Sequence, residues 1–150
     1  MTTGIANSKA NDEAQIRALI DNRAQAVRDK NVNEAISNIA PDILSFDVVN
    51  PFQQKGSDAS RKRAEDWFSS FEGTIGYEVT ELSITAGDNV AFSHGLSHVS
   101  GTKTDGGQLD MWWRMTVCFH KIDEKWMVTH EHNSVPFDVE SGKASLDFKP

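Results

Sequence analysis

The sequence is poor in the features that mark several specialised classes of protein. One cysteine, Cys118, excludes an internal disulfide and is compatible with a reducing compartment. The chain has no apolar run long enough to cross a membrane, and residues 1–11 contain no apolar core of signal-peptide length. Fifteen basic residues against 22 acidic ones leave a net charge of −7, which argues against a nucleic-acid or anionic-membrane partner. We therefore expect a cytoplasmic protein.

What is present is the composition of one globular domain. The chain has 150 residues, of which 38% are hydrophobic and 25% charged. This length and this balance are ordinary for a single domain. We expect one domain over residues 12–136, with a flexible N-terminal tail over residues 1–11 and a surface tail over residues 137–150.

Apolar spacing predicts three helices in the first half of the chain. Asp12 begins a capping box and opens a helix to about residue 29. A short helix over residues 33–39 ends before Pro41, because the residue that precedes a proline disfavours helical geometry. Ser57 opens a third helix to about residue 71, whose basic run Arg61-Lys62-Arg63 we interpret as a solvated face.

The second half of the chain has the pattern of long β-strands. After a short strand over residues 43–49, we expect strands over 77–86 and 90–100 and a long hairpin over 109–136. The apolar parity of the strand 77–86 slips near Thr80–Glu81, which indicates a bulge. The order of elements predicts an α+β fold, a strongly curved mixed or antiparallel sheet wrapped as a cone around three N-terminal helices. Such cones close over pockets.

The register of the long hairpin decides which of its side chains face such a pocket. A three-residue loop, Ile122-Asp123-Glu124, places odd residues opposite odd ones, and a two-residue loop exchanges the assignments on the second strand. We favour the first register. It places on the inner face Trp113, Met115, Val117, Phe119, Met127, Thr129, Glu131 and Asn133. It places on the outer face Trp112, Arg114, Thr116, Val128, His130, His132 and Ser134.

The outer face predicted in this way is too apolar to be simply solvated, because it carries Trp112 and Val128 beside histidines. We expect a homodimer through this face, with Arg114, His130 and His132 in the contact.

The hairpin carries a resemblance to a known family. Its most specific part is Arg114-x-Thr116 followed by Trp126-x-Val128-x-His130-Glu131-His132-x-Ser134-x-Pro136. With the order of elements over residues 12–136, this stretch resembles the nuclear transport factor 2-like superfamily, in its SnoaL-like and ketosteroid-isomerase-like branch. The ending is also similar to the association domain of the calcium/calmodulin-dependent kinases. The resemblance implies a cystatin-like α+β roll.

The resemblance transfers only part of the ketosteroid isomerase machinery. Those enzymes have a general-base Asp at the end of the first strand, nine residues ahead of a Gly, and Asp47 stands in that place before Gly56. Their first-helix Tyr has no counterpart, since residues 12–29 contain no aromatic. The second Asp of those enzymes, which is protonated and belongs to the oxyanion hole, would fall near Thr116, and a threonine cannot play that role equally well. Steroid isomerisation by that mechanism is therefore not expected.

Asp47 and His94 are the candidate catalytic residues. Asp47 lies in an apolar strand, where it is either a general base of raised pKa or a carboxylate that binds a backbone N–H group or an arginine. His94 is either a buried histidine satisfied by hydrogen bonds or a polar group that contacts the ligand. The candidate substrate-binding residues are Trp67, Phe71, Trp113, Met115, Glu131 and Asn133.

No metal or other cofactor is expected. His130 and His132 alternate on one strand and could both bind one ion, but a third ligand is needed and Glu131 points the other way in the favoured register. Two functions stay open. The first is an enzyme that isomerises, dehydrates or cyclises a hydrophobic small molecule by acid–base chemistry. The second is a non-catalytic module that binds a small hydrophobic or acidic ligand, or that associates with a second copy.

Overall fold

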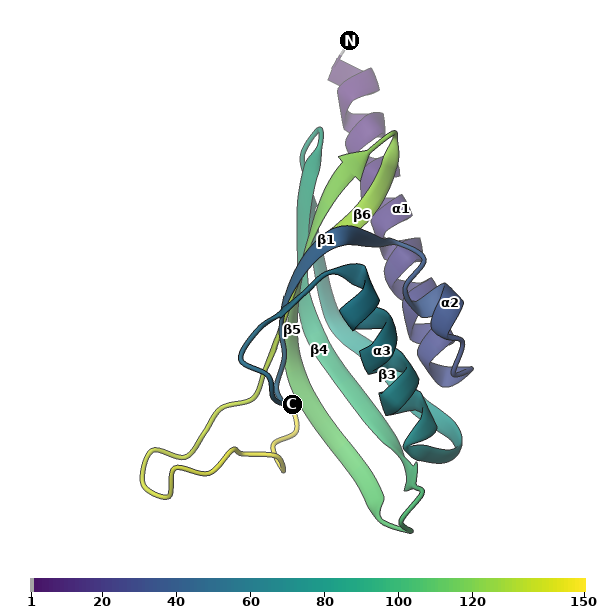
Figure 1. Cartoon of the computed structure of the whole chain (residues 1–150). Helices are drawn as coiled ribbons and strands as arrows, with labels where there is room; N and C mark the ends of the chain where they lie inside the picture. The colour runs from purple at the N-terminus through teal and green to yellow at the C-terminus, as the bar shows by residue number, and fades with distance from the viewer. Residues whose placement is uncertain (1) are drawn as a thin grey trace.

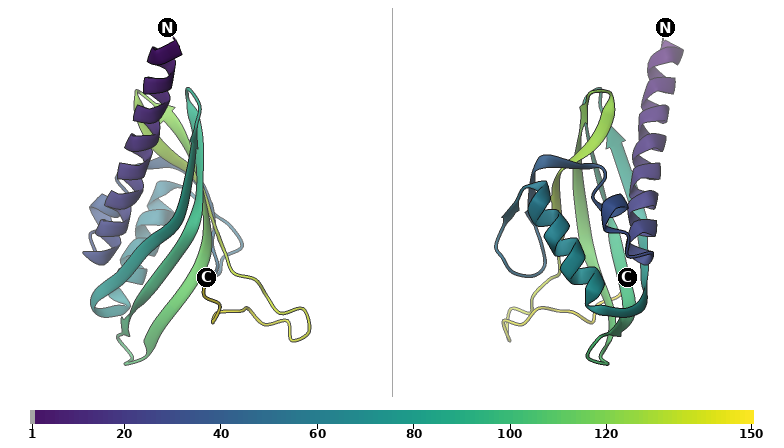
Figure 2. Two further views of the ribbon diagram at one scale, coloured as in Figure 1. Left: turned by 180° about the vertical axis from the view of Figure 1, so that it is seen from behind. Right: turned by 45° about the vertical axis from the view of Figure 1, so that its right-hand side comes forward.

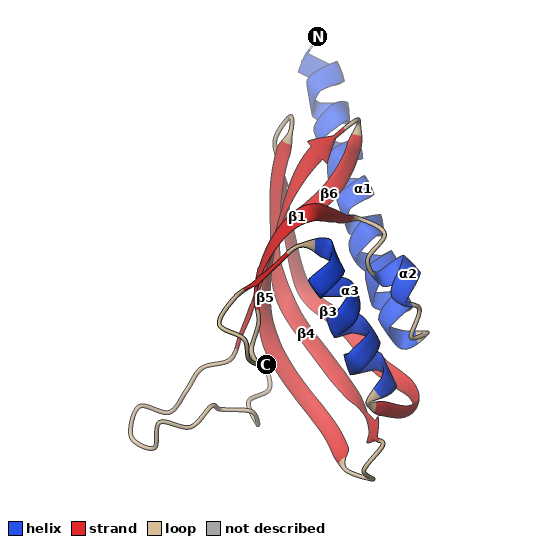
Figure 3. Cartoon of the chain, in the orientation of Figure 1, coloured by secondary structure: helices blue, strands red, loops and turns tan. Residues whose placement is uncertain are grey.

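Helices cover one face of a curved mixed sheet (Figures 1 and 3). The computed structural model describes residues 2–150, with side chains from Ser8 onward. The helices in this part of the chain are α1 (Thr2–Arg28), α2 (Val32–Ala35) and α3 (Ser57–Ser69). The strands are β1 (Ile39–Phe46), β2 (Gln54–Lys55), β3 (Phe71–Ala86), β4 (Val90–Lys103), β5 (Gln108–Ile122) and β6 (Lys125–Ser134). None of the described helices is both long and apolar enough to cross a membrane.

The sheet has six strands in the order β2-β1-β6-β5-β4-β3. Adjacent strands pair antiparallel except for β1 and β6, which run parallel. The sheet curves toward the helices and does not close, because β2 and β3 form its two edges (Figure 2). The predicted α+β architecture, helices followed by a strongly curved mixed sheet, is confirmed.

The first helix is longer than predicted. It begins at Thr2 instead of Asp12, so residues 2–11 continue the helix instead of forming a loose tail. Asp12 does not cap a helix. Its carboxylate is buried against the sheet, where it accepts hydrogen bonds from the Trp126 indole at 3.2 Å and from the Lys121 ammonium at 2.9 Å.

The first strand also begins earlier than predicted. β1 starts at Ile39 and includes Pro41. The short helix predicted over residues 33–39 is α2, which ends at Ala35. The Asn31 side chain caps this short helix by accepting a hydrogen bond from the Glu34 N–H group. Residues 137–150 form an irregular segment beside the sheet (Figure 1). Within this segment, Phe137 forms an isolated β-bridge with Ala144.

Two apolar clusters fill the space between helices and sheet. In the first, Ile16 and Ile20 of α1 pack with Phe119 and Val128 of the hairpin. The second is formed by Phe68, Phe71, Ile75 and Val99. Trp113 packs against both clusters.

The hairpin loop has two residues, which corrects the prediction of three. Ile122 pairs with Lys125, and the loop residues Asp123 and Glu124 both have positive φ, 50° and 67°. This turn places Val128 opposite Phe119 with its side chain fully buried, whereas the prediction put Val128 outside.

A bulge at Thr129 then shifts the register by one residue. Beyond it, Val117 pairs with Glu131 and Met115 pairs with Asn133. An extra residue on one strand exchanges the two faces of that strand. Glu131 and Asn133 therefore face inward as predicted, although the predicted loop that led to this placement is wrong.

The bulge predicted near Thr80–Glu81 is confirmed. The pairing of β3 with β4 shifts between Thr80 and Ser83, and Glu81 has a positive φ of 53°. On the partner strand, a Cβ atom added to Gly95 would lie 3.1 Å from the Thr80 carbonyl oxygen, so a side chain at this position would crowd the bulge.

Candidate functional site

A cavity of about 750 Å³ lies between the concave face of the sheet and the helices, and most of its wall is apolar. Cavities of this size hold small organic molecules. The apolar side chains of the wall include Trp67, Phe68, Val79, Val99, Trp113 and Met115.

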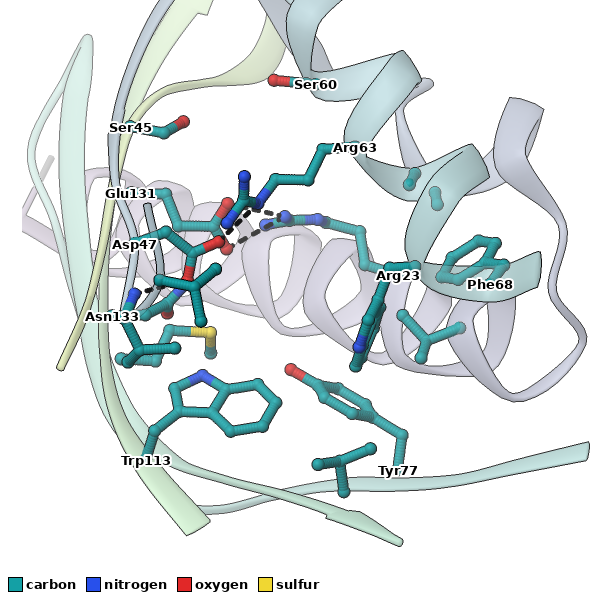
Figure 4. Close-up of a pocket in the computed structure, with 18 of the residues that line it drawn as sticks. Arg23, Ser45, Asp47, Ser60, Arg63, Phe68, Tyr77, Trp113, Glu131 and Asn133 are labelled. Atoms are coloured by element: carbon teal, nitrogen blue, oxygen red, sulfur yellow. Dashed lines mark hydrogen bonds and ion pairs between the residues drawn. The ribbon is translucent and has the colours of Figure 1, made fainter. Parts of the chain in front are cut away.

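One end of the cavity is polar, where the parallel strands β1 and β6 meet. Ser45 of β1 pairs with Glu131 of β6, and side chains two residues apart on a strand share a face. Asp47, directly after β1, and Asn133 therefore lie beside them on the inner face, and all four residues line the cavity (Figure 4).

Two arginines from the helices meet the carboxylates at this end. One terminal guanidinium nitrogen of Arg23, on α1, lies 3.1 Å and 3.2 Å from the two oxygens of Glu131. Nε of Arg63, on α3, lies 2.7 Å from Oδ2 of Asp47 (Figure 4). Each pair sums to zero charge, so the polar end offers hydrogen bonds without a net charge.

Asp47 binds both kinds of partner expected for a structural carboxylate. Besides Arg63, it accepts a hydrogen bond from the backbone N–H group of Val48 at 2.7 Å. The Nδ2 atom of Asn133 donates to the same oxygen, Oδ1, at 3.5 Å. Three donors thus hold the carboxylate in the cavity wall.

Tyr77 of β3 adds a hydroxyl group to the apolar wall. The hydroxyl donates to Oγ of Ser97 at 3.1 Å. Burial raises the pKa of Tyr77, so the phenol stays neutral at ordinary pH and can donate hydrogen bonds. The Tyr77 ring lies 6.0 Å from that of Trp113 and 6.5 Å from that of Trp67, so the three rings form one aromatic wall.

Lys103 also lines the cavity. Its ammonium donates to Oγ of Ser70 at 2.6 Å and lies 4.0 Å from the centre of the Phe71 ring. Burial lowers the pKa of Lys103. Phe71 itself is not in the cavity wall, which corrects its expected role. Its ring packs in the core, where a Cβ atom added to Gly101 would come within 2.9 Å of it.

His94 is not in the cavity, which corrects its candidate role. On β4 the inner face is formed by Ala91, Ser93, Gly95, Ser97 and Val99, so the larger residues Phe92, His94 and Leu96 face outward. This inner face has small residues at four of its five positions, and the Tyr77 hydroxyl reaches Ser97 there. The imidazole of His94 is exposed on the outer face, so it neither packs in the core nor lines the cavity.

His130 and His132 lie on the outer face, as predicted, with Glu131 on the opposite face. The Nδ1 atom of His130 lies 2.7 Å from the carbonyl oxygen of Leu44, and Phe46 packs edge-on against both rings. In the part of the chain with described side chains, no three His, Cys, Asp or Glu residues converge as metal ligands do.

Sequence reasoning missed Arg23, Arg63 and Tyr77. Arg63 belongs to the basic run interpreted as a solvated face, and Lys62 of that run does form an exposed pair with Asp66. Helical spacing contained a signal for Arg63, because it lies four residues before Trp67 and so shares its side of α3. For Arg23 the sequence has no such signal, since its partner is 108 residues away.

The comparisons with known proteins agree with this geometry. Residues 16–138 match the family model of the SnoaL-like domain. A nuclear transport factor 2-like protein of unknown function from Pseudomonas putida KT2440 is 33% identical, with a TM-score of 0.86 over 94% of this chain and 98% of that one.

Two more distant structures share the fold. A ketosteroid isomerase-like protein from Erwinia carotovora atroseptica is 16% identical, with a TM-score of 0.70 over 82% of this chain and 95% of that one. A protein with a cystatin-like fold from Caulobacter vibrioides is 17% identical, with a TM-score of 0.70 over 85% of this chain and 91% of that one. Among curated proteins, none matches this chain. The match of the family model over most of its length shows that the chain belongs to the SnoaL-like family, within the nuclear transport factor 2-like superfamily.

Proposed function

We propose that the cavity binds a hydrophobic small molecule and that Asp47 takes a proton from it, in an isomerisation, dehydration or cyclisation without a cofactor. The observation that carries this proposal is the Asp47 carboxylate in the wall of a largely apolar cavity. A carboxylate fixed beside a bound apolar molecule has the geometry that general-base catalysis requires.

The contacts of Asp47 leave room for this role. An ionised carboxylate has about four lone-pair positions for hydrogen bonds. Arg63, the Val48 N–H group and Asn133 occupy three of them. The remaining position can accept a proton from a carbon next to a ligand carbonyl. The C–H electron pair then forms the C=C bond of an enolate while the C=O π pair moves to the oxygen, and return of the proton to another carbon completes an isomerisation.

Deuterium exchange tests this step without knowledge of the natural substrate. β-Tetralone, an apolar ketone with acidic C–H groups, is incubated with the protein in deuterium oxide, and loss of its α-protons is followed by proton NMR. We expect catalysed exchange by the wild type and by Asp42→Asn, the same change at an exposed position on β1. We expect exchange to fall to the uncatalysed rate in Asp47→Asn. Equal exchange by Asp47→Asn and the wild type would exclude Asp47 as the base.

A second candidate function, a non-catalytic binding and association module, is favoured by the outer face of the sheet. Phe92 is 47% exposed and Val90 53% exposed there, and the Trp112 ring stacks on His98 at 4.3 Å. We propose that this face, with Arg114, His130 and His132, pairs with a second copy.

Native mass spectrometry tests the association. We expect a dimer for the wild type and a monomer for Phe92→Glu, and a monomeric wild type would contradict the pairing. Catalysed exchange of β-tetralone by the wild type would rule out the purely non-catalytic function.

The free, half-buried Cys118 fits a reducing compartment, and we propose the cytoplasm as the location.

A further inference from the structure

Two buried polar atoms in the cavity wall have no protein partner within hydrogen-bond distance among the described residues. They are Nε1 of Trp113 and Oδ1 of Asn133. The indole nitrogen is a donor only, and the amide oxygen is an acceptor only. A buried donor or acceptor without a partner is unfavourable, so a ligand that satisfies both atoms gains affinity. Neither atom is exposed to the cavity, so the ligand reaches them after a neighbouring side chain moves.

The orientation of the Asn133 amide is fixed by Asp47. Its Nδ2 atom faces Oδ1 of Asp47 at 3.5 Å. The flipped amide would place its oxygen against the carboxylate oxygen, which is unfavourable. Oδ1 of Asn133 is therefore the atom left for a ligand.

The two residues are diagonal neighbours across the β5–β6 pair, and both lie next to Met115, whose flexible side chain is the one that moves aside. Asn133 of β6 pairs with Met115 of β5, and Trp113 lies two residues before Met115 on the same face. Residues on this diagonal of an antiparallel pair are about 7–8 Å apart at their Cα atoms. Figure 4 shows the Trp113 nitrogen on the side of the ring that faces the end of the cavity occupied by Asn133 and Asp47.

The charges around these atoms disfavour an anionic ligand. Arg23 and Arg63 are already paired with Glu131 and Asp47. A carboxylate placed between Trp113 and Asn133 would approach the negative groups Asp47 and Glu131. It also has no proton to donate to the Asn133 oxygen. A neutral group meets no such repulsion.

We propose that the ligand presents a neutral group that both accepts and donates a hydrogen bond, a hydroxyl or a carboxamide. Its oxygen accepts from Nε1 of Trp113, and its O–H or N–H donates to Oδ1 of Asn133. This selectivity rests on the proposed function of the cavity and names the class of molecule that enters it. The aromatic wall of Trp67, Tyr77 and Trp113 suits a flat apolar body.

Four phenanthrene derivatives with one common body test the selectivity. The carboxamide both accepts and donates, the methyl ketone only accepts, the carboxylate is charged, and the ethyl compound does neither. Binding is measured by isothermal titration calorimetry. One hydrogen bond is worth about 0.5–1.5 kcal/mol net, or roughly a 2- to 12-fold change in Kd. We expect the carboxamide to bind most tightly, the ketone next, and the ethyl compound and the carboxylate most weakly.

Two variants separate the two hydrogen bonds, and a third is the control. Trp113→Phe keeps an aromatic wall and removes the donor, so it should weaken both the carboxamide and the ketone by roughly 2- to 12-fold. Asn133→Leu removes the acceptor, so it should weaken the carboxamide alone and abolish its advantage over the ketone. Trp112→Phe is the matched control, because the neighbouring tryptophan stacks on His98 on the outer face. It should change none of the four affinities.

The possible failures are distinguishable. If none of the four compounds binds, the proposed cavity function fails and the selectivity falls with it. If all four bind equally and Trp113→Phe changes nothing, the cavity function stands and the selectivity is overturned. Tightest binding by the carboxylate would also overturn it, and would point to Lys103 as the group that selects the ligand.

Discussion

Arg63 and Asp47 connect a helix to the sheet at the polar end of the cavity. Nε of the arginine on α3 lies 2.7 Å from Oδ2 of the aspartate directly after β1, and the two side chains are 26% and 28% exposed. A pair buried to this extent has lost much of its hydration, so removing one partner costs more than it would on an open surface.

We therefore expect Arg63→Met to lower the free energy of unfolding by about 1–2 kcal/mol. Arg61→Met is the control, because Arg61 makes only an exposed hydrogen bond to Asn33 in the described part of the chain. Urea unfolding followed by circular dichroism measures both changes. Equal stability of the two variants would show that the Arg63–Asp47 pair does not hold α3 on the sheet.

Asp12 anchors the middle of α1 to the hairpin through Trp126 and Lys121. In Asp12→Ala the buried indole N–H group loses its acceptor, so we expect a loss of about 2 kcal/mol. For a chain of this size, this loss lowers Tm by about 4–8 °C. Glu13→Ala, at the exposed neighbouring position, should change Tm by less than about 2 °C. Differential scanning calorimetry compares the two, and a similar Tm would contradict the anchoring role.

The second residue of the turn between β5 and β6 disfavours the geometry of this turn. Asp123 and Glu124 both have positive φ, which is the two-residue hairpin conformation that prefers glycine at its second position. Glu124→Gly should raise the free energy of unfolding by up to about 1 kcal/mol. Lys125→Gly, one residue further and inside β6, should lower it. A loss of stability in Glu124→Gly would contradict the two-residue turn.

His98 joins three strands on the outer face. Its two ring nitrogens lie 3.0 Å from Glu78 and 2.8 Å from Asp110. Partial burial lowers the pKa of His98, but the hydrogen bonds to the two carboxylates outweigh it and raise the pKa above 6.5. The charged ring therefore stabilises the fold below about pH 6.5, and this contribution disappears as the pH rises through the raised pKa.

The comparison with His98→Gln tests this pH dependence. The difference in unfolding free energy between wild type and variant should be largest at about pH 5.5 and should shrink toward about pH 8.5. His120→Gln is the control on an exposed position of β5. A difference for His98→Gln that is constant with pH, or that grows as the pH rises, would contradict the charged bridge.

The order of helices and strands could be predicted because it depends on local periodicity. The apolar spacing of α1 and the alternation along β5 are properties of neighbouring residues, and the structure keeps them. The start of α1 was missed because Asp12 resembles a cap, whereas its carboxylate serves a partner more than 100 residues away, Trp126.

The site was harder to predict because it depends on register and on contacts between distant elements. The bulge at Thr129 leaves no mark on the apolar pattern, yet it turns Glu131 and Asn133 into the cavity. His94 was misplaced because the inner side of β4 has mainly small residues, one of which, Ser97, accepts a hydrogen bond from the Tyr77 hydroxyl, so the large residues point outward. Arg23 reaches Glu131 only through the packing of α1 on the sheet.

The four tryptophans provide the most direct test of the cavity. Trp67 and Trp113 line it, Trp112 lies on the outer face, and the Trp126 indole donates to Asp12 in the core. The measurement is a proton–nitrogen correlation spectrum of the four indole N–H groups, assigned with single Trp→Phe variants, during addition of phenanthrene carboxamide. We predict that the Trp113 resonance shifts the most, downfield, that Trp67 shifts less, and that Trp112 and Trp126 stay in place. A spectrum in which Trp112 shifts while Trp113 stays in place would contradict binding in the cavity.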